Sequence, residues 1–107
     1  MAGSYQVVIT ADAKRHLREI IQYLGKTASF DIAQKVRDGI EEEISRLADQ
    51  PHSYGILQAL KDNTIVYRKA LKWSYRIIFT IEEPGFIVYV VRIDHEKSDP
   101  SHLKNLP

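Results

Sequence analysis

The sequence has no cysteine, and this single absence removes three kinds of chemistry. Disulfide cross-links, thiolate zinc sites and cysteine nucleophiles are all excluded. Glycine occurs only five times and proline four times in 107 residues, so the composition is not that of a linker or a low-complexity chain. No apolar run approaches the ~18 to 20 residues that span a bilayer, and the N-terminus does not follow a signal-peptide pattern. We therefore expect a cytoplasmic protein with no membrane association, held together by packing alone.

The common sequence signatures of cofactor and metal sites are also missing. There is no glycine-rich phosphate loop, no G-x-S-x-G elbow and no H-E-x-x-H motif. Asp94, His95 and Glu96 are consecutive, and neighbours on an extended chain point to opposite faces, so they cannot share one ion without a special turn. We expect neither a metal nor a cofactor.

Charge of one sign is scarce overall but concentrated locally. Fifteen basic and fourteen acidic side chains give a net charge of +1. The isoelectric point is about 8.0, whereas dedicated nucleic-acid-binding domains typically have one above ~9. The basic excess lies in one stretch, in which only Asp62 is acidic and which contains Lys61, Arg68, Lys69, Lys72 and Arg76. Such a patch can bind a phosphate chain or an acidic protein.

The length predicts one domain over residues 1–107, because two separate cores would leave about fifty residues each. Residues 1–4 are expected to be disordered. Residues 5–10 alternate and are β-branched, which predicts a strand. Thr10 or Asp12 can then cap a helix that has one apolar stripe. Gly25 is a credible end for this helix.

A second helix is predicted from about Phe30, with Pro51 beyond its end, and the short connection makes the two helices antiparallel. Gly39 lies in the middle of this helix at a cost of ~1 kcal/mol relative to alanine. This glycine indicates close approach by the first helix or by a partner, and accidental tolerance is an equally good explanation.

The second half changes to a period of two, with strands expected over residues 65–71, 74–81 and 86–93. Their short connections predict an antiparallel meander, so the fold class is α+β: an N-terminal strand, an antiparallel helical hairpin, then a three-stranded meander. The helical hairpin should cover the face that carries Tyr75, Ile77, Phe79 and Ile81. The other face and the sheet end remain for function, and residues 94–107 read as a polar, irregular tail.

Arg76 is the most informative residue, because a guanidinium in a central strand is costly unless it meets a carboxylate, a phosphate or water. It is either half of an internal ion pair or an anion-binding residue. If the following turn adds one residue, Arg76 and Arg92 come opposite one another and need an anion between them; otherwise Arg76 faces Val91. Of the consecutive Arg68 and Lys69, at most one can share a face with Arg76.

Other polar and aromatic residues near the patch have two readings each. His95 follows the last predicted strand and can titrate near neutral pH or simply cap the strand. Trp73 can stack on bases or pack at a hairpin. The candidates for target binding are Arg68, Lys72, Trp73 and Arg92. For Arg68, Lys69 and Lys72, solubility is the simpler explanation.

The arrangement resembles the RelE/ParE superfamily of toxins from bacterial type II toxin–antitoxin modules, which are also described as plasmid-stabilisation proteins. The likeness covers nearly the whole chain. It rests on the strand Tyr5–Thr10 leading into a helical hairpin, the Ala48-Asp-Gln-Pro51 exit, the basic Tyr67-Arg-Lys strand, the Tyr75-Arg-Ile-Ile-Phe79 core and the strand before His95.

The resemblance implies a growth-arresting toxin, with two alternatives for its activity. A RelE-like member would cut messenger RNA on the ribosome, with Arg76, Lys69 and His95 as catalytic residues. A ParE-like member would bind and inhibit DNA gyrase without being an enzyme. The endonuclease group usually has several basic residues and an aromatic after the last strand, whereas this chain has Asp94, Glu96 and Asp99 there and no tyrosine after Tyr89, which favours the ParE-like alternative.

The resemblance also implies a cognate antitoxin that neutralises the toxin. Its flexible C-terminal segment would bury apolar surface along the helices or add to the sheet edge, and toxin and antitoxin would form a hetero-oligomer. A third alternative is a degenerate, nontoxic module that retains only antitoxin binding.

Overall fold

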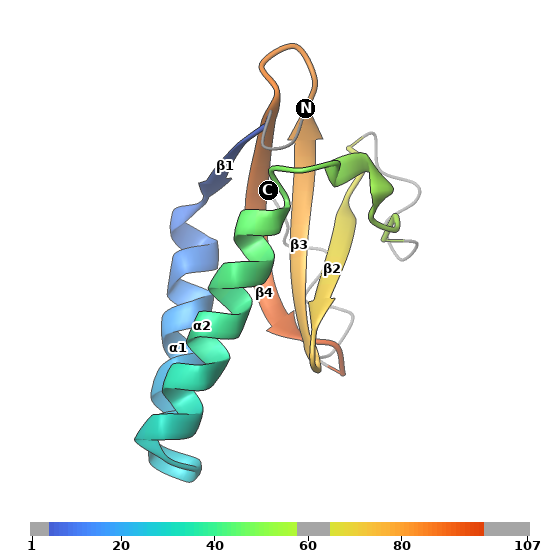
Figure 1. The fold of residues 1–107 in the computed structure, drawn as a ribbon. Coiled ribbons are helices and arrows are strands. Elements are labelled where there is room, and N and C mark those ends of the chain that lie inside the picture. The colour runs from blue at the N-terminus through green and yellow to red at the C-terminus, as the bar shows by residue number, and fades with distance from the viewer. Residues whose placement is uncertain (1–4, 58–64, 98–107) are drawn as a thin grey trace.

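The computed structural model describes residues 5–57 and 65–97, which form two helices packed on a four-stranded sheet (Figure 1). The elements, in chain order, are β1 (Gln6–Ile9), α1 (Ala11–Thr27), α2 (Phe30–Arg46), a 3-10 turn (Pro51–Ser53), β2 (Arg68–Lys72), β3 (Tyr75–Glu82) and β4 (Ile87–His95). The predicted α+β fold class is confirmed. The expectations for residues 1–4, Lys61, Asp62 and the segment after Lys97 lie outside the described residues.

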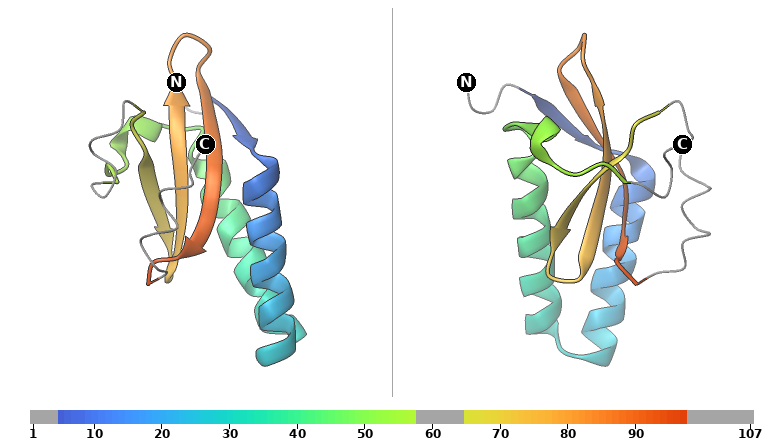
Figure 2. Two further views of the ribbon diagram at one scale, coloured as in Figure 1. Left: turned by 180° about the vertical axis from the view of Figure 1, so that it is seen from behind. Right: turned by 90° about the vertical axis from the view of Figure 1, so that its right-hand side faces the viewer.

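Side-chain caps define where both helices begin. The Thr10 hydroxyl accepts a hydrogen bond from the Ala13 amide at 3.3 Å, and the Ser29 hydroxyl accepts one from the Ile32 amide at 3.0 Å. The predicted stop at Gly25 is wrong, because α1 continues to Thr27. Glycine inside a helix costs only ~1 kcal/mol, and the packing of the preceding apolar stripe outweighs that cost. Figure 2 shows the two antiparallel helices extending together past one end of the sheet.

The sheet order is β1-β4-β3-β2, with β1 parallel to β4 and the other neighbours antiparallel. The predicted meander is confirmed, with shifted boundaries. β2 begins at Arg68 rather than at Ile65, and β4 continues to His95 rather than ending at Ile93. Asp94 is therefore part of a strand and not of an irregular tail.

The main core lies between the helices and one face of the sheet. It includes Ile40, Ile44 and Leu47 from α2 and its end, together with Ile77 and Phe79 from β3. The predicted helix-covered face is confirmed, because Tyr75 and Ile81 also pack against this core. A second, smaller core of Leu57, Tyr67, Ile78 and Val91 lies on the opposite face, which we call the helix-free face.

Gly39 is required by a close approach, which is made by the β2–β3 hairpin rather than by the first helix. A Cβ atom at this position would lie 2.4 Å from Cη2 of Trp73, at the tip of the β2–β3 hairpin. Trp73 itself has a φ of 54°, in the left-handed region that non-glycine residues seldom adopt. The pair lets α2 pack closely against the hairpin.

Candidate functional site

The helix-free face carries three of the predicted functional residues. Lys69 is opposite Ile78 in the sheet, and Arg76 lies two residues from Ile78 on the same strand, so Lys69 and Arg76 share this face. Arg92 is also opposite Ile78 and joins them from β4. The prediction that at most one of Arg68 and Lys69 shares a face with Arg76 is confirmed, and that residue is Lys69.

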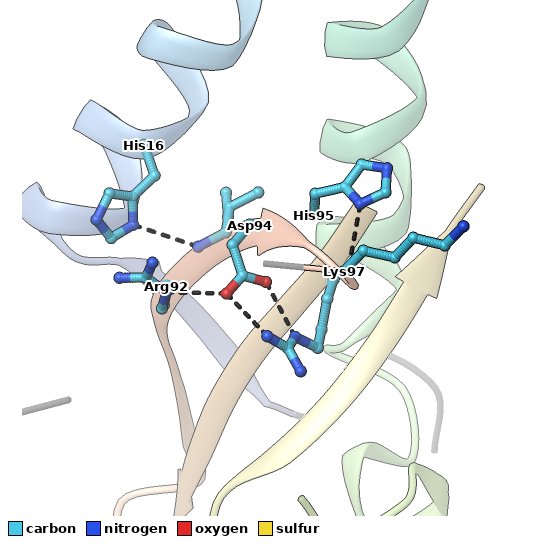
Figure 3. Close-up of polar contacts among 7 residues, drawn as sticks. His16, Arg92, Asp94, His95 and Lys97 are labelled. Carbon is cyan, nitrogen blue, oxygen red and sulfur yellow. Dashed lines mark hydrogen bonds and ion pairs between the residues drawn. The ribbon is translucent and has the colours of Figure 1, made fainter. Parts of the chain in front are cut away.

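The centre of this face is an ion cluster in which one carboxylate serves two guanidiniums (Figure 3). Arg76 donates from Nε to Asp94 Oδ1 and from a terminal nitrogen to Oδ2, both at 2.9 Å. Arg92 donates from Nε to the same Oδ2 at 3.0 Å. The side chain of Arg76 is only 11% exposed and that of Asp94 only 6%. The two-pronged geometry matches the planar fork of arginine to a carboxylate.

Both registers expected from the sequence are wrong, because Arg76 is opposite Asp94. The first pair next to the β3–β4 loop is Glu82 with Ile87. The loop is therefore one residue longer than the register that would place Arg76 opposite Arg92. A β-bulge next to Ile78 then adds a further residue on β4. Arg76 and Arg92 still share a face, and the anion that this arrangement needs is supplied by the protein itself.

This cluster limits what Arg76 can do. Its guanidinium is occupied by Asp94. Removal of one member of a buried ion pair of this kind lowers the free energy of unfolding by several kcal/mol. An incoming phosphate would have to compete with a carboxylate that is already in place and largely shielded from water. Lys69, by contrast, is exposed and is the open basic group among the described residues of this face.

His95 lies on the other side of the sheet from Arg76. It is opposite Tyr75, whose ring packs toward the main core, and the two ring centroids are 5.7 Å apart in an edge-to-face arrangement. His95 Nδ1 accepts a hydrogen bond from the Lys97 amide at 3.1 Å, so the ring is held beside the turn that follows β4 (Figure 3). The three residues predicted for catalysis, Arg76, Lys69 and His95, are therefore not gathered on one face.

His16 is a polar residue of this region that sequence analysis missed. Its Nδ1 accepts a hydrogen bond from the Ile93 amide at 3.3 Å, beyond the point where β1 stops pairing with β4 (Figure 3). Burial, with the positive charges of Arg92 and Arg15, lowers the pKa of His16. Its position in the sequence could have revealed this contact, because His16 lies three residues after Ala13 and so on the face of α1 that packs against the sheet. A cavity of about 390 Å³ separates α1 from the ends of β3 and β4, lined by His16, Tyr23, Tyr75 and His95 among others.

The remaining candidates have structural contacts. A terminal nitrogen of Arg68 donates to the carbonyls of Tyr54 at 2.7 Å and His52 at 3.3 Å, which fixes the segment after the 3-10 turn. The Lys72 ammonium lies 4.9 Å from the Trp73 ring centroid, a cation–π distance. Trp73 is 52% exposed, so part of its ring stays accessible at the hairpin tip. These residues do not form one surface with Arg76.

Within residues 5–57 and 65–97 no three histidine or acidic side chains are grouped so that they could hold a metal ion. In the same part of the chain, no helix has the length and apolar character needed to cross a membrane.

Comparison with known proteins agrees with this architecture. Residues 7–100 match the family described as the ParE toxin of the type II toxin–antitoxin system parDE. No curated protein sequence matches the chain.

Solved structures of related systems have the same fold. A chain of a chromosomal ParDE toxin–antitoxin system from P. aeruginosa aligns with a TM-score of 0.70 at 17% identity, covering 88% of this chain and 98% of the other. A chain of the RelBE2 complex from Mycobacterium tuberculosis aligns with a TM-score of 0.59 at 21% identity, covering 90% and 94%. A free-state variant of E. coli RelE aligns with a TM-score of 0.55 at 18% identity, covering 96% and 93%. The family match over residues 7–100 shows that this chain belongs to the ParE toxin family of type II toxin–antitoxin systems, and it shares its fold with these solved structures.

Proposed function

We propose that this toxin arrests growth by binding DNA gyrase as a protein ligand, and that a cognate antitoxin neutralises it. The observation that carries the proposal is the state of Arg76, whose fork is engaged by Asp94 on a face that His95 does not share. Cleavage of RNA needs a base, an acid and a cation around one phosphate. A binding role needs only exposed groups in a fixed arrangement.

The sheet offers such groups along β2 and its hairpin. Lys69 and Leu71 are exposed on the helix-free face, and Trp73 is exposed at the tip. A cation and an apolar side chain on one face, with a half-exposed aromatic ring at the end of the same hairpin, supply residue types that protein interfaces use. This strip is the surface that we assign to the target.

The proposal is tested with toxin made by cell-free synthesis and added to two assays. In a gyrase supercoiling assay the toxin should inhibit the reaction, and Lys69→Glu or Trp73→Ala should weaken inhibition about tenfold or more. In a ribosome-dependent assay messenger RNA should stay intact. Codon-phased cleavage without gyrase inhibition would contradict the proposal and establish the RelE-like alternative.

Growth experiments separate these activities from the degenerate module. Induced expression without the antitoxin should arrest growth, whereas normal growth at verified soluble levels would leave only the antitoxin-binding role. Both proposed targets are cytoplasmic, so we also place the toxin in the cytoplasm.

The antitoxin is supported by the similar structures, of which one is the RelBE2 toxin–antitoxin complex of M. tuberculosis and another an archaeal RelE–RelB complex from Pyrococcus horikoshii. The candidate is the protein encoded by the reading frame next to the toxin gene. Co-expression should restore growth and give a stable complex on gel filtration.

A further inference from the structure

The cavity of about 390 Å³ beside α1 lies where this helix extends past one end of the sheet, and we call it the end cavity (Figure 2). Ile20 of α1 and Ile93 of β4 supply the aliphatic part of its lining. Its volume falls within the range of ~300–1,000 Å³ that is typical of small-molecule sites. The end cavity is therefore large enough to hold a small organic ligand.

Three aromatic rings line the end cavity. Tyr75 and His95 are paired across β3 and β4, with ring centroids 5.7 Å apart. Tyr23 joins them from α1, and the pKa of Tyr75 is raised by burial and, to a smaller extent, by Tyr23. Tyr23 and His95 are exposed and Tyr75 is half-buried, so ring surface is open to a ligand. The face of a tyrosine ring carries negative potential and attracts cations.

Glu19 adds a carboxylate to the same lining. It lies one helical turn before Tyr23, on the same side of α1. Arg15 Nη1 is 4.0 Å from Glu19 Oε2, whereas Arg15 donates a hydrogen bond to Asp12 at 3.1 Å. Exposed ion pairs at such a distance are weak, so the Glu19 carboxylate can meet a second cation.

The positive charge of the lining lies toward the other end of the cavity. Arg92 donates to Asp94, and together with burial it lowers the pKa of His16, which is neutral at pH 7. His16 and Tyr23 are seven residues apart on α1, about 10 Å along the helix axis. This separation is longer than the ~8 Å screening length at physiological salt, so the charge beside His16 acts weakly at the tyrosines.

We propose that the end cavity binds an alkylammonium group, with Tyr23 and Tyr75 against the cation and Glu19 balancing its charge. Its source is a lysine side chain of another protein or a free polyamine, because both carry an ammonium group on an alkyl chain. Ile20 and Ile93 would contact that chain. An anion fits less well, since its charge would meet Glu19 beside the rings. The proposal is independent of the gyrase and antitoxin assignments.

The test compares three ligands of nearly the same shape, each titrated into the full-length labelled toxin and followed by NMR chemical shifts. Choline is a cation, 3,3-dimethyl-1-butanol is its neutral analogue and 3,3-dimethylbutyrate is an anion. We expect choline to bind at least about fivefold more tightly than the other two, with the largest shifts in the rings of Tyr23 and Tyr75. Equal binding of all three, or tightest binding of the anion, would overturn the proposal.

Two double variants locate the site. Tyr23→Leu combined with Glu19→Gln removes one exposed ring and one exposed carboxylate from the lining. Phe30→Leu combined with Glu41→Gln is the matched control, because it removes the same two kinds of group at exposed positions outside the lining. The cavity variant should bind choline about fivefold or more weakly, and the control should change binding less than about twofold. Wild-type affinity in a cavity variant that circular dichroism shows to be folded would place the site elsewhere.

Spermidine and a lysine tripeptide with blocked ends separate the two sources of the ammonium group. Tighter binding of the peptide would support a protein side chain as the ligand, and tighter binding of spermidine would support a free polyamine. In either case the cavity variant should bind that ligand more weakly than the matched control does. If neither compound binds the wild type, the assigned ligand class is wrong even where choline binds.

Discussion

At the scale of single residues, Asp94 organises the polar part of the helix-free face. It accepts hydrogen bonds from both Arg76 and Arg92, and it is the least exposed member of the cluster. Removal of either arginine leaves the other paired with Asp94. Removal of Asp94 leaves two guanidiniums without this carboxylate in a poorly solvated place.

We therefore predict that Asp94→Asn lowers the free energy of unfolding by about 2–4 kcal/mol, and that Arg76→Met costs less. Urea denaturation followed by circular dichroism measures both. Glu96→Gln, an exposed change in the next turn, is the control and should stay within about 0.5 kcal/mol of the wild type. A larger loss for Arg76→Met than for Asp94→Asn would show that Asp94 is not the organising residue.

Gly39 gives a prediction whose sign depends on its neighbour. Gly39→Ala should destabilise the protein, because the new Cβ would meet the Trp73 ring at 2.4 Å. In a Trp73→Ala background the same change should stabilise by up to about 1 kcal/mol, through helix propensity alone. Gly25→Ala is the control within α1, where a Cβ would meet nothing within 4 Å, and it should also stabilise. Thermal denaturation of the four variants and the wild type decides the matter.

At the scale of elements, α1 continues the contact with β4 beyond the point where β1 ends. The Thr10 amide donates to the Val90 carbonyl at 3.0 Å, and the next contact with the edge of β4 is made by His16, which accepts from the Ile93 amide. One strand and the helix that follows it thus cover the same edge in turn. The His16 contact therefore satisfies the amide of the residue next to Asp94.

This contact predicts a pH dependence. The pKa of His16 is lowered in the folded state, chiefly by burial and then by Arg92 and Arg15, against the opposing charges of Asp12 and Glu19. As the pH falls below about 6.5, His16 binds a proton in the unfolded chain but stays neutral in the folded protein. The free energy of unfolding therefore decreases. His16→Gln, which can still accept from the amide but does not titrate, should reduce the loss between pH 7.5 and 5.5. An unchanged loss in urea denaturation would refute the role of His16.

At the scale of the whole molecule, the main core is shared by all the long elements, with residues from α1, α2, β2, β3 and β4 in one cluster. The smaller core on the helix-free face shares β3 and β4 with it. No helix or strand has a separate core of its own in the described residues. We therefore propose that the chain folds as one cooperative unit.

The corresponding prediction is a single unfolding transition. Trp73 is the only tryptophan and sits where the hairpin meets α2, so its fluorescence reports on packing between the sheet and the helices. Far-ultraviolet circular dichroism reports mainly on the helices. The two urea curves should share one midpoint, and separate midpoints would indicate that the helical hairpin and the sheet unfold independently.

Local patterns were enough to predict the elements of this fold and the face of the sheet that is buried. Apolar spacing located both helices, alternation located the strands, and Arg76 stood out as a charge that needed an anion. These inferences succeed because periodicity and the cost of an unpaired charge act over a few residues.

The tertiary structure alone decided which groups meet. The longer β3–β4 loop and the bulge beside Ile78 brought Asp94 opposite Arg76, and no short-range pattern encodes such an offset. Gly39 needed Trp73 and His16 needed Ile93, contacts across 34 and 77 residues of the sequence. Periodicity assigns a side chain to a face, whereas the partner on that face depends on register and on the packing of helices against the sheet, which are properties of the whole fold.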